Sequence, residues 1–148
     1  MTTCLTSARF ALSGIEAEAM SKAMLVDTDV MIDYLRGHGR AVALVRKHAD
    51  RIILSSVVVA ELYAGVKGSR EQTILDDLVS LFPVVPMTVE IARNAGLFRR
   101  DYGKSHGVGL ADAILAATAQ SETAELCTLN VKHYPMMKGL KPAHARKK

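Results

Sequence analysis

Three acidic residues stand alone in otherwise apolar stretches of the chain. Asp27 ends a run that begins with three apolar residues, Glu61 is the only charged residue in 57–66, and Asp112 is the only charged residue in 108–119. Burying a lone carboxylate costs free energy unless something compensates its charge. Because three such acids occur in core-like segments, we expect a compensator that they share. A hard divalent cation, which takes oxygen ligands, is the simplest one.

This acid pattern predicts a particular chemistry. Three carboxylates brought together without a cation repel one another and raise one another's pKa values. A bound Mg²⁺ or Mn²⁺ removes that penalty, activates a water molecule and neutralises charge that develops on a phosphoryl group. The sequence contains no GxSxG motif and no GxxxxGK[ST] loop, so no side-chain nucleophile is indicated. Acids and a metal ion alone are enough for phosphodiester hydrolysis, and Asp27, Glu61 and Asp112 are the candidates to share that ion and act as catalytic residues.

Each acid also has a simpler structural interpretation. Asp27 is followed by Thr28 and Asp29, and either aspartate is a good N-cap for a helix that starts there. Glu61 is compatible with the solvent face of a mostly buried helix. Asp112 falls in a first helical turn, where the helix dipole favours a carboxylate. These interpretations stay open for each acid alone, whereas the coincidence of all three favours a shared site.

Short apolar segments alternate with helical patterns along the chain. We expect strands at 24–27, 51–54, 83–87 and 125–129, and a last short strand near Gly139 and Leu140. Helices are expected at 28–35, 40–49, 56–67, 70–81, 88–102 and 110–121. This order predicts a three-layer α/β/α fold of Rossmann-like type, with a central and mostly parallel sheet.

The predicted fold places the acids at one edge. Ligands of parallel sheets bind outside the carboxyl ends of the strands. Asp27 lies at that end of the first strand, and Thr128 and Asn130 lie at the same end of the strand at 125–129. We expect Asn130 to be a supporting catalytic residue whose amide oxygen orients water or a ligand.

Composition and charge bound the remaining possibilities. The chain has 148 residues, 49% of them apolar, and a net charge of +4. This is enough for one domain at 24–140 with a real core. We expect 1–23 to be an extension, either an appended helix or the result of an upstream start codon, and 141–148 to be a basic tail. No membrane span or secretory signal is recognisable, so we expect a cytoplasmic protein.

Four segments together resemble the motifs of PIN-domain nucleases. They are, in chain order, 25–33, 56–65, 109–119 and 128–134. Each motif alone is weak, but four in sequence, covering 24–140, are fairly specific. The small size and the string Ala-Glu-Leu-Tyr-Ala-Gly at 60–65 are most similar to the VapC-type toxins of bacterial toxin–antitoxin pairs.

The resemblance implies a function and partners. Asp27, Glu61 and Asp112 would be the metal-binding acids of an endoribonuclease that uses Mg²⁺ or Mn²⁺. The family often carries a fourth acid where this chain has Asn130, so a second metal ion is not assumed. The family also implies a homodimer, and a cognate antitoxin whose tail blocks the cleft.

The substrate would be RNA, and three basic residues just before the Asp112 loop are the candidates to hold its backbone. These are Arg99, Arg100 and Lys104. A solvated helix end explains the same residues without any RNA contact.

Two other functions fit parts of the pattern. Asp27 and Asp29 also form the DxD element of a phosphatase of the haloacid-dehalogenase type, in which Asp27 would be a covalent nucleophile. Met31 stands where that family has Thr or Val, and the chain is short for that fold. A non-catalytic module that binds RNA or protein would explain the basic charge, but it would not need three lone acids.

Overall fold

The computed structural model of this chain describes residues 22–144. The predicted extension is therefore seen only at its last two residues, and the basic tail only up to His144. No helix in the described range is long and apolar enough to cross a membrane.

Four parallel strands form the centre of the molecule. They are β1 (Met24–Val26), β2 (Ile52–Ser55), β3 (Val84–Val85) and β4 (Glu125–Cys127). Their order across the sheet is β3-β2-β1-β4, so β1 and β2 are central. Leu25 lies opposite Ile53 on one side and Leu126 on the other. The predicted parallel sheet is confirmed.

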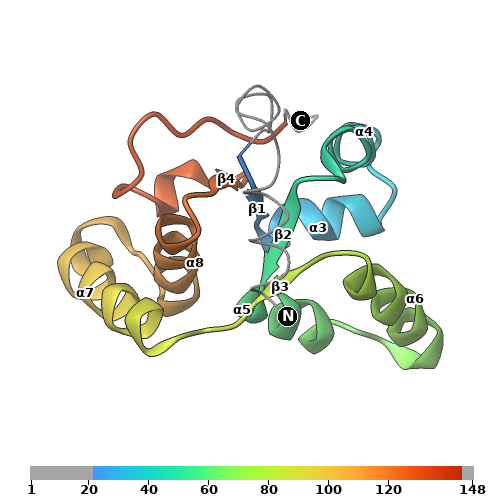
Figure 1. The fold of residues 1–148 in the computed structure, drawn as a ribbon, viewed down its shortest axis with the longest axis horizontal. Helices are drawn as coiled ribbons and strands as arrows, with labels where there is room; N and C mark the ends of the chain where they lie inside the picture. The colour runs from blue at the N-terminus through green and yellow to red at the C-terminus, as the bar shows by residue number, and fades with distance from the viewer. Residues whose placement is uncertain (1–21, 145–148) are drawn as a thin grey trace, which may run out of the picture.

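Helices connect the strands and cover the sheet. They are α3 (Thr28–Leu35), α4 (Gly39–His48), α5 (Ser56–Ala64), α6 (Gly68–Ser80), α7 (Val89–His106) and α8 (Leu110–Ser121), followed by a 3-10 turn, η1 (Val131–His133). Figure 1 shows α7 and α8 on one side of the sheet and α3 and α4 on the other. The three-layer α/β/α prediction is therefore confirmed.

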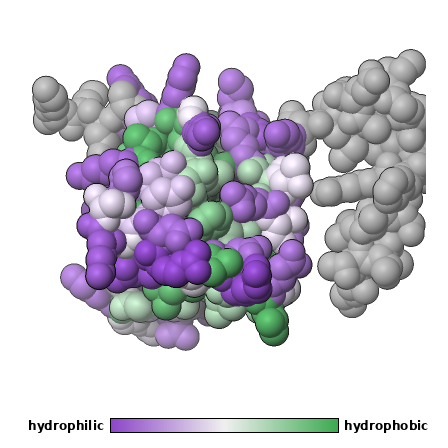
Figure 2. Space-filling model, turned by 90° about the vertical axis from the view of Figure 1, so that its left-hand side faces the viewer, coloured by the Kyte–Doolittle hydropathy of each residue, from purple (hydrophilic) through white to green (hydrophobic). Residues whose placement is uncertain are grey.

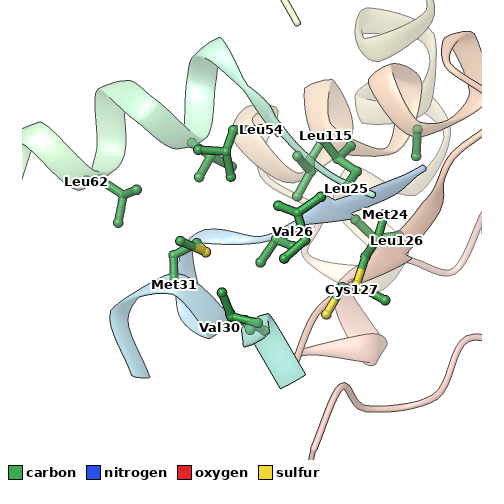
Figure 3. Packing of buried hydrophobic residues seen from close by; sticks show 14 of the residues in the cluster. Met24, Leu25, Val26, Val30, Met31, Leu54, Leu62, Leu115, Leu126 and Cys127 are labelled. Atoms are coloured by element: carbon green, nitrogen blue, oxygen red, sulfur yellow. The ribbon is translucent and has the colours of Figure 1, made fainter. Parts of the chain in front are cut away.

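The core is built around β1. Leu25 and Val26 are fully buried, as expected for a central parallel strand that is covered on both faces. Leu115 of α8 lies on one side of β1, and Val30 and Met31 of α3 lie on the other (Figure 3). The strand whose end carries Asp27 is therefore held from both faces.

Several predicted boundaries were wrong, for local reasons. The helix predicted to run to Lys67 ends at Ala64, and α6 already begins at Gly68 with Lys67 as its N-cap. The amide of Lys67 donates to Glu71 Oε2, which satisfies a free donor at this helix start. The predicted loop at Gly103 is helical, because α7 continues to His106 and ends at Gly107 in the left-handed conformation.

Strand lengths also differ from the prediction. The third strand is only Val84–Val85, and the fourth ends at Cys127. The strand predicted near Gly139 and Leu140 is absent, because this part of the described chain forms turns. Gly139 has a φ of 76°, a left-handed conformation that favours a turn over a strand, and Gly37 in an earlier turn has a similar φ of 77°.

Candidate functional site

Asp27 lies at the carboxyl end of β1 and is the N-cap of α3. Its Oδ1 accepts a hydrogen bond of 2.7 Å from the amide of Thr28. Its Oδ2 accepts hydrogen bonds of 2.8 Å from the hydroxyls of both Thr128 and Tyr134. Asp27 is only 8% exposed. Three donors of the chain itself therefore compensate this buried carboxylate, in addition to the external cation that the sequence led us to expect.

Asp112 comes from the first turn of α8 and meets Asp27 through a shared partner. Its Oδ1 accepts from the Tyr134 hydroxyl at 3.2 Å, and its Oδ2 lies 3.3 Å from His133 Nδ1. Burial raises the pKa of Asp112, and the negative charge of Asp27 raises it further, while His133 and Tyr134 act in the opposite direction. The structure thus brings Asp27 and Asp112 together as a like-charged pair.

Glu61 lies on α5 and differs from the other two acids. It is exposed to solvent, so the expectation that it is a buried acid was wrong. Its Oε1 accepts a hydrogen bond of 2.9 Å from the hydroxyl of Thr28, the residue next to Asp27. In the described range, no three His, Cys, Asp or Glu side chains are arranged to hold a metal ion as they stand. Within the part of the chain that the structure describes, Thr28 is therefore the residue that joins Glu61 to the acid pair.

Asn130 contacts Asp29, which is not one of the three predicted metal ligands. Its amide nitrogen donates to Asp29 Oδ2 at 3.2 Å, and the backbone amide of Leu129 donates to the same oxygen at 3.1 Å. Thr128 Oγ1 also lies 3.4 Å from Asp29 Oδ2. Asp29 therefore ties the start of α3 to the loop after β4. The supporting catalytic role predicted for Asn130 stays a prediction.

Sequence reasoning assigned no role to two residues of the site, His133 and Tyr134. Both lie at the end of η1, in the segment that also supplies Thr128 and Asn130. Tyr134 is only 1% exposed. Burial and the charges of Asp27 and Asp112 raise the pKa of Tyr134 above its usual range, so its hydroxyl stays protonated and remains a donor. A tyrosine just after a polar turn was the sequence signal that could have indicated this contact. If its ring is buried, its hydroxyl needs a hydrogen-bond partner.

The three basic candidates for RNA contact lie on α7. Arg99, Arg100 and Lys104 are all exposed. Arg100 pairs with Asp101 at 2.8 Å, and the guanidinium of Arg99 occupies the space that a Cβ at Gly103 would take. Seen from the side of α7 and α8, the surface is largely hydrophilic, with smaller apolar patches (Figure 2). RNA contact by these residues stays a prediction.

A groove of about 350 Å³ lies between α3, α5 and α6. Glu61 is among the residues that line it, so the groove adjoins the acids. Its apolar lining includes Ile32, Leu35, Leu62 and Ile74. Leu35 and Ile74 are exposed side chains, 39% and 48% respectively. An apolar groove therefore opens to solvent beside the candidate site.

Comparison with known proteins identifies the family. The family model of the PIN domain matches residues 24–134, which include all three predicted acids. The chain belongs to the PIN-domain family. The resemblance based on four motifs is thereby confirmed, and the membership decides against a haloacid-dehalogenase-type phosphatase.

Two relatives from Mycobacterium tuberculosis match most of the chain. Ribonuclease VapC10 is 43% identical over 125 residues, covering 82% of this chain and 93% of the relative. Ribonuclease VapC19 is 37% identical over 124 residues, covering 81% of this chain and 98% of the relative. The matches thus extend over almost the whole length of these relatives.

Solved structures share the PIN-domain fold. A chain of a toxin–antitoxin complex from Klebsiella pneumoniae matches with a TM-score of 0.72 and 24% identity, covering 82% of this chain and 98% of the other. A chain of FitAcB from Neisseria gonorrhoeae matches with a TM-score of 0.61 and 26% identity, covering 75% and 91%. The α/β/α architecture around the acids is therefore that of known structures.

Proposed function

We propose that this PIN-domain chain is a divalent-metal-dependent endoribonuclease and the toxin of a toxin–antitoxin pair. The observation that carries the proposal is the pairing of Asp27 and Asp112 on one hydroxyl at the carboxyl end of the sheet. Relatives that share the domain over most of its length are named ribonucleases. A like-charged pair with one raised pKa is the kind of site that a cation stabilises.

The donor set fits a hard cation. Asp27 Oδ1 and the carboxylate of Asp112 would supply oxygen ligands, and Glu61, an exposed carboxylate joined to the residue next to Asp27 by the Thr28 hydroxyl, would be the third acid. When bound, Mg²⁺ or Mn²⁺ supplies an activated water and neutralises charge on the phosphoryl group. The chain's own part is to hold these oxygens in place.

Other residues would bind and orient the substrate. The guanidinium and ammonium groups of Arg99, Arg100 and Lys104 would attract RNA phosphates, a contribution that weakens as salt increases. His133 holds Asp112 Oδ2 and, being partly exposed, lies where an RNA strand could contact it. Asn130 would support the site indirectly, by fixing Asp29 and the loop after β4.

The groove beside Glu61 supports the proposal of an antitoxin partner. An apolar segment of a small protein that filled this groove would also cover Glu61. The bound segment would thereby block access to the acids. A homodimer is proposed as well, because Leu81, Met87 and Val89 near the edge strand β3 are 71%, 51% and 88% exposed. A cytoplasmic location follows from an RNA substrate and is part of the same proposal.

Cleavage of total RNA by the purified chain tests the proposed function. We expect cleavage with Mg²⁺ or Mn²⁺, none with chelator, and none by Asp112→Asn. Asp77→Asn, which changes an exposed aspartate on α6, is the matched control and should cleave normally. Cleavage that survives both chelator and Asp112→Asn would contradict the proposal. Metal-independent RNA binding without cleavage would instead favour a non-catalytic module.

A further inference from the structure

Among the hydrogen bonds of the described residues, the hydroxyl of Tyr134 is the one group that bonds to both Asp27 and Asp112. It lies 2.8 Å from Asp27 Oδ2 and 3.2 Å from Asp112 Oδ1. The ring is buried, with 1% of the residue exposed, and belongs to the core that packs around β1. The hydroxyl therefore stands at a fixed point between two carboxylates that come from different elements.

The hydrogen bonds determine which oxygen of Asp27 can take a ligand. A carboxylate oxygen offers about two lone-pair sites. Among the described residues, Oδ2 already accepts from the hydroxyls of Thr128 and Tyr134, whereas Oδ1 accepts only from the amide of Thr28. Asp27 thus presents Oδ1 alone, and Tyr134 helps to hold that orientation.

Asp112 depends on the same hydroxyl in another way. Its side chain is 28% exposed, so it can turn toward solvent. The negative charge of Asp27 disfavours a second carboxylate close by. The hydroxyl of Tyr134 is a neutral donor between the two acids, and its single hydrogen, shared between Asp27 Oδ2 and Asp112 Oδ1, offsets part of this repulsion. Without it, we expect Asp112 to spend more time away from Asp27.

We propose that Tyr134 is a positioning residue whose hydroxyl holds the carboxylates of Asp27 and Asp112 in the arrangement that receives a divalent cation. This inference rests on the proposed function, because it concerns the same site. It assigns to this side chain no direct contact with substrate or metal. Partners behind metal ligands commonly change metal affinity by about 10- to 100-fold when they are removed.

The variant Tyr134→Phe removes the hydroxyl and keeps the buried ring. Calorimetric titration with Mn²⁺ should give a dissociation constant about tenfold higher than that of the wild-type chain. Tyr63→Phe is the matched control, because Tyr63 also donates to a carboxylate, that of Asp76, but outside the site. The control should bind Mn²⁺ like the wild type. Unchanged or tighter binding by Tyr134→Phe would overturn the inference.

A second measurement needs no metal. In chelator, thermal unfolding of wild type, Tyr134→Phe, Asp112→Asn and the double variant forms a double-mutant cycle. We expect the changes in Tm to be non-additive, because each single variant already breaks the contact between the two residues. Additive changes would overturn the inference even if the wild type binds Mn²⁺. Non-additive changes in a chain that binds no Mn²⁺ would confirm the contact and refute both the metal site and its positioning by Tyr134.

Discussion

The two sides of the candidate site are built differently. On one side, Asp27 and Asp112 are buried or partly buried and receive donors from the segment that follows β4, namely Thr128, His133 and Tyr134. On the other side, Glu61 stands on an exposed face of α5 and accepts one hydrogen bond, from Thr28. The first side is preorganised and the second is adaptable.

The three acids should therefore contribute unequally to metal binding. A preorganised pair keeps its geometry without a ligand, so most of the binding free energy is available to the cation. An exposed glutamate must lose side-chain freedom when it binds, and this reduces its net contribution. We therefore expect the acid pair to dominate metal binding and Glu61 to complete it.

The largest expected effect comes from removing one acid of the pair. Asp112→Asn takes away a charged oxygen ligand from the preorganised side, so Mn²⁺ affinity should fall by at least about a hundredfold. Isothermal titration with Mn²⁺ measures this directly, with Asp77→Asn as the control. An affinity within about threefold of the wild type would mean that the pair is not the binding site.

Glu61→Gln should have a smaller effect. The amide keeps one oxygen and the hydrogen bond from Thr28, while the negative charge is lost. We expect Mn²⁺ affinity to fall by about tenfold, because the glutamate contributes less than the pair. Glu71→Gln, an exposed glutamate at the start of α6, is the control. A loss of Mn²⁺ affinity as large as that of Asp112→Asn would contradict the expected difference between the two sides of the site.

Thr28→Val should have a still smaller effect, because it removes only the hydrogen bond that holds Glu61. The variant keeps the shape of the side chain and the backbone amide that donates to Asp27 Oδ1, but it removes the hydroxyl that ties Glu61 to α3. We expect kcat/KM for RNA cleavage to fall by about two- to fivefold, since an exposed hydrogen bond contributes ~1 kcal/mol or less. Thr73→Val, on the exposed face of α6, controls for the loss of a hydroxyl. No change in kcat/KM would show that Thr28 does not position Glu61.

The smallest effect concerns stability and pH in chelator. The pKa of Asp112 is raised in the folded chain by burial and by Asp27, so folding favours its protonated form. Its contribution to stability is therefore present at low pH and is lost as the pH rises through the folded pKa. Asp112→Asn stays neutral, so its Tm relative to the wild type should rise over that window. A Tm difference that is independent of pH, or that falls, would contradict the repulsion between the two acids.

The sequence was sufficient for the sheet and for the edge where the acids lie. Apolar runs at β1 and β2 and helical patterns between them predicted the parallel α/β/α fold, and Asp27 was placed correctly at the end of β1. The short edge strand β3 and the absence of a strand near Gly139 were not predictable from apolar runs alone. Strand length at an edge depends on neighbours as much as on local propensity.

The partners of the acids were harder to predict than the acids themselves. Thr128 and Tyr134 both donate to Asp27, although they lie about a hundred positions after it in the chain. Such contacts depend on the register of β1 against β4 and on the course of η1, which local patterns do not encode. For the same reason the hydrogen bond from the amide nitrogen of Asn130 to Asp29 was not predictable from the sequence.

The most direct test of the central claim is to locate the bound cation. Substoichiometric Mn²⁺ added to ¹⁵N-labelled chain broadens the NMR signals of nearby backbone amides. We predict that the amides of Thr28 and Ala113, next to Asp27 and Asp112, broaden first and that the amide of Leu62, next to Glu61 on α5, follows. Broadening centred instead on the exposed acids of α6, Asp76 and Asp77, would contradict a metal site at the acid pair.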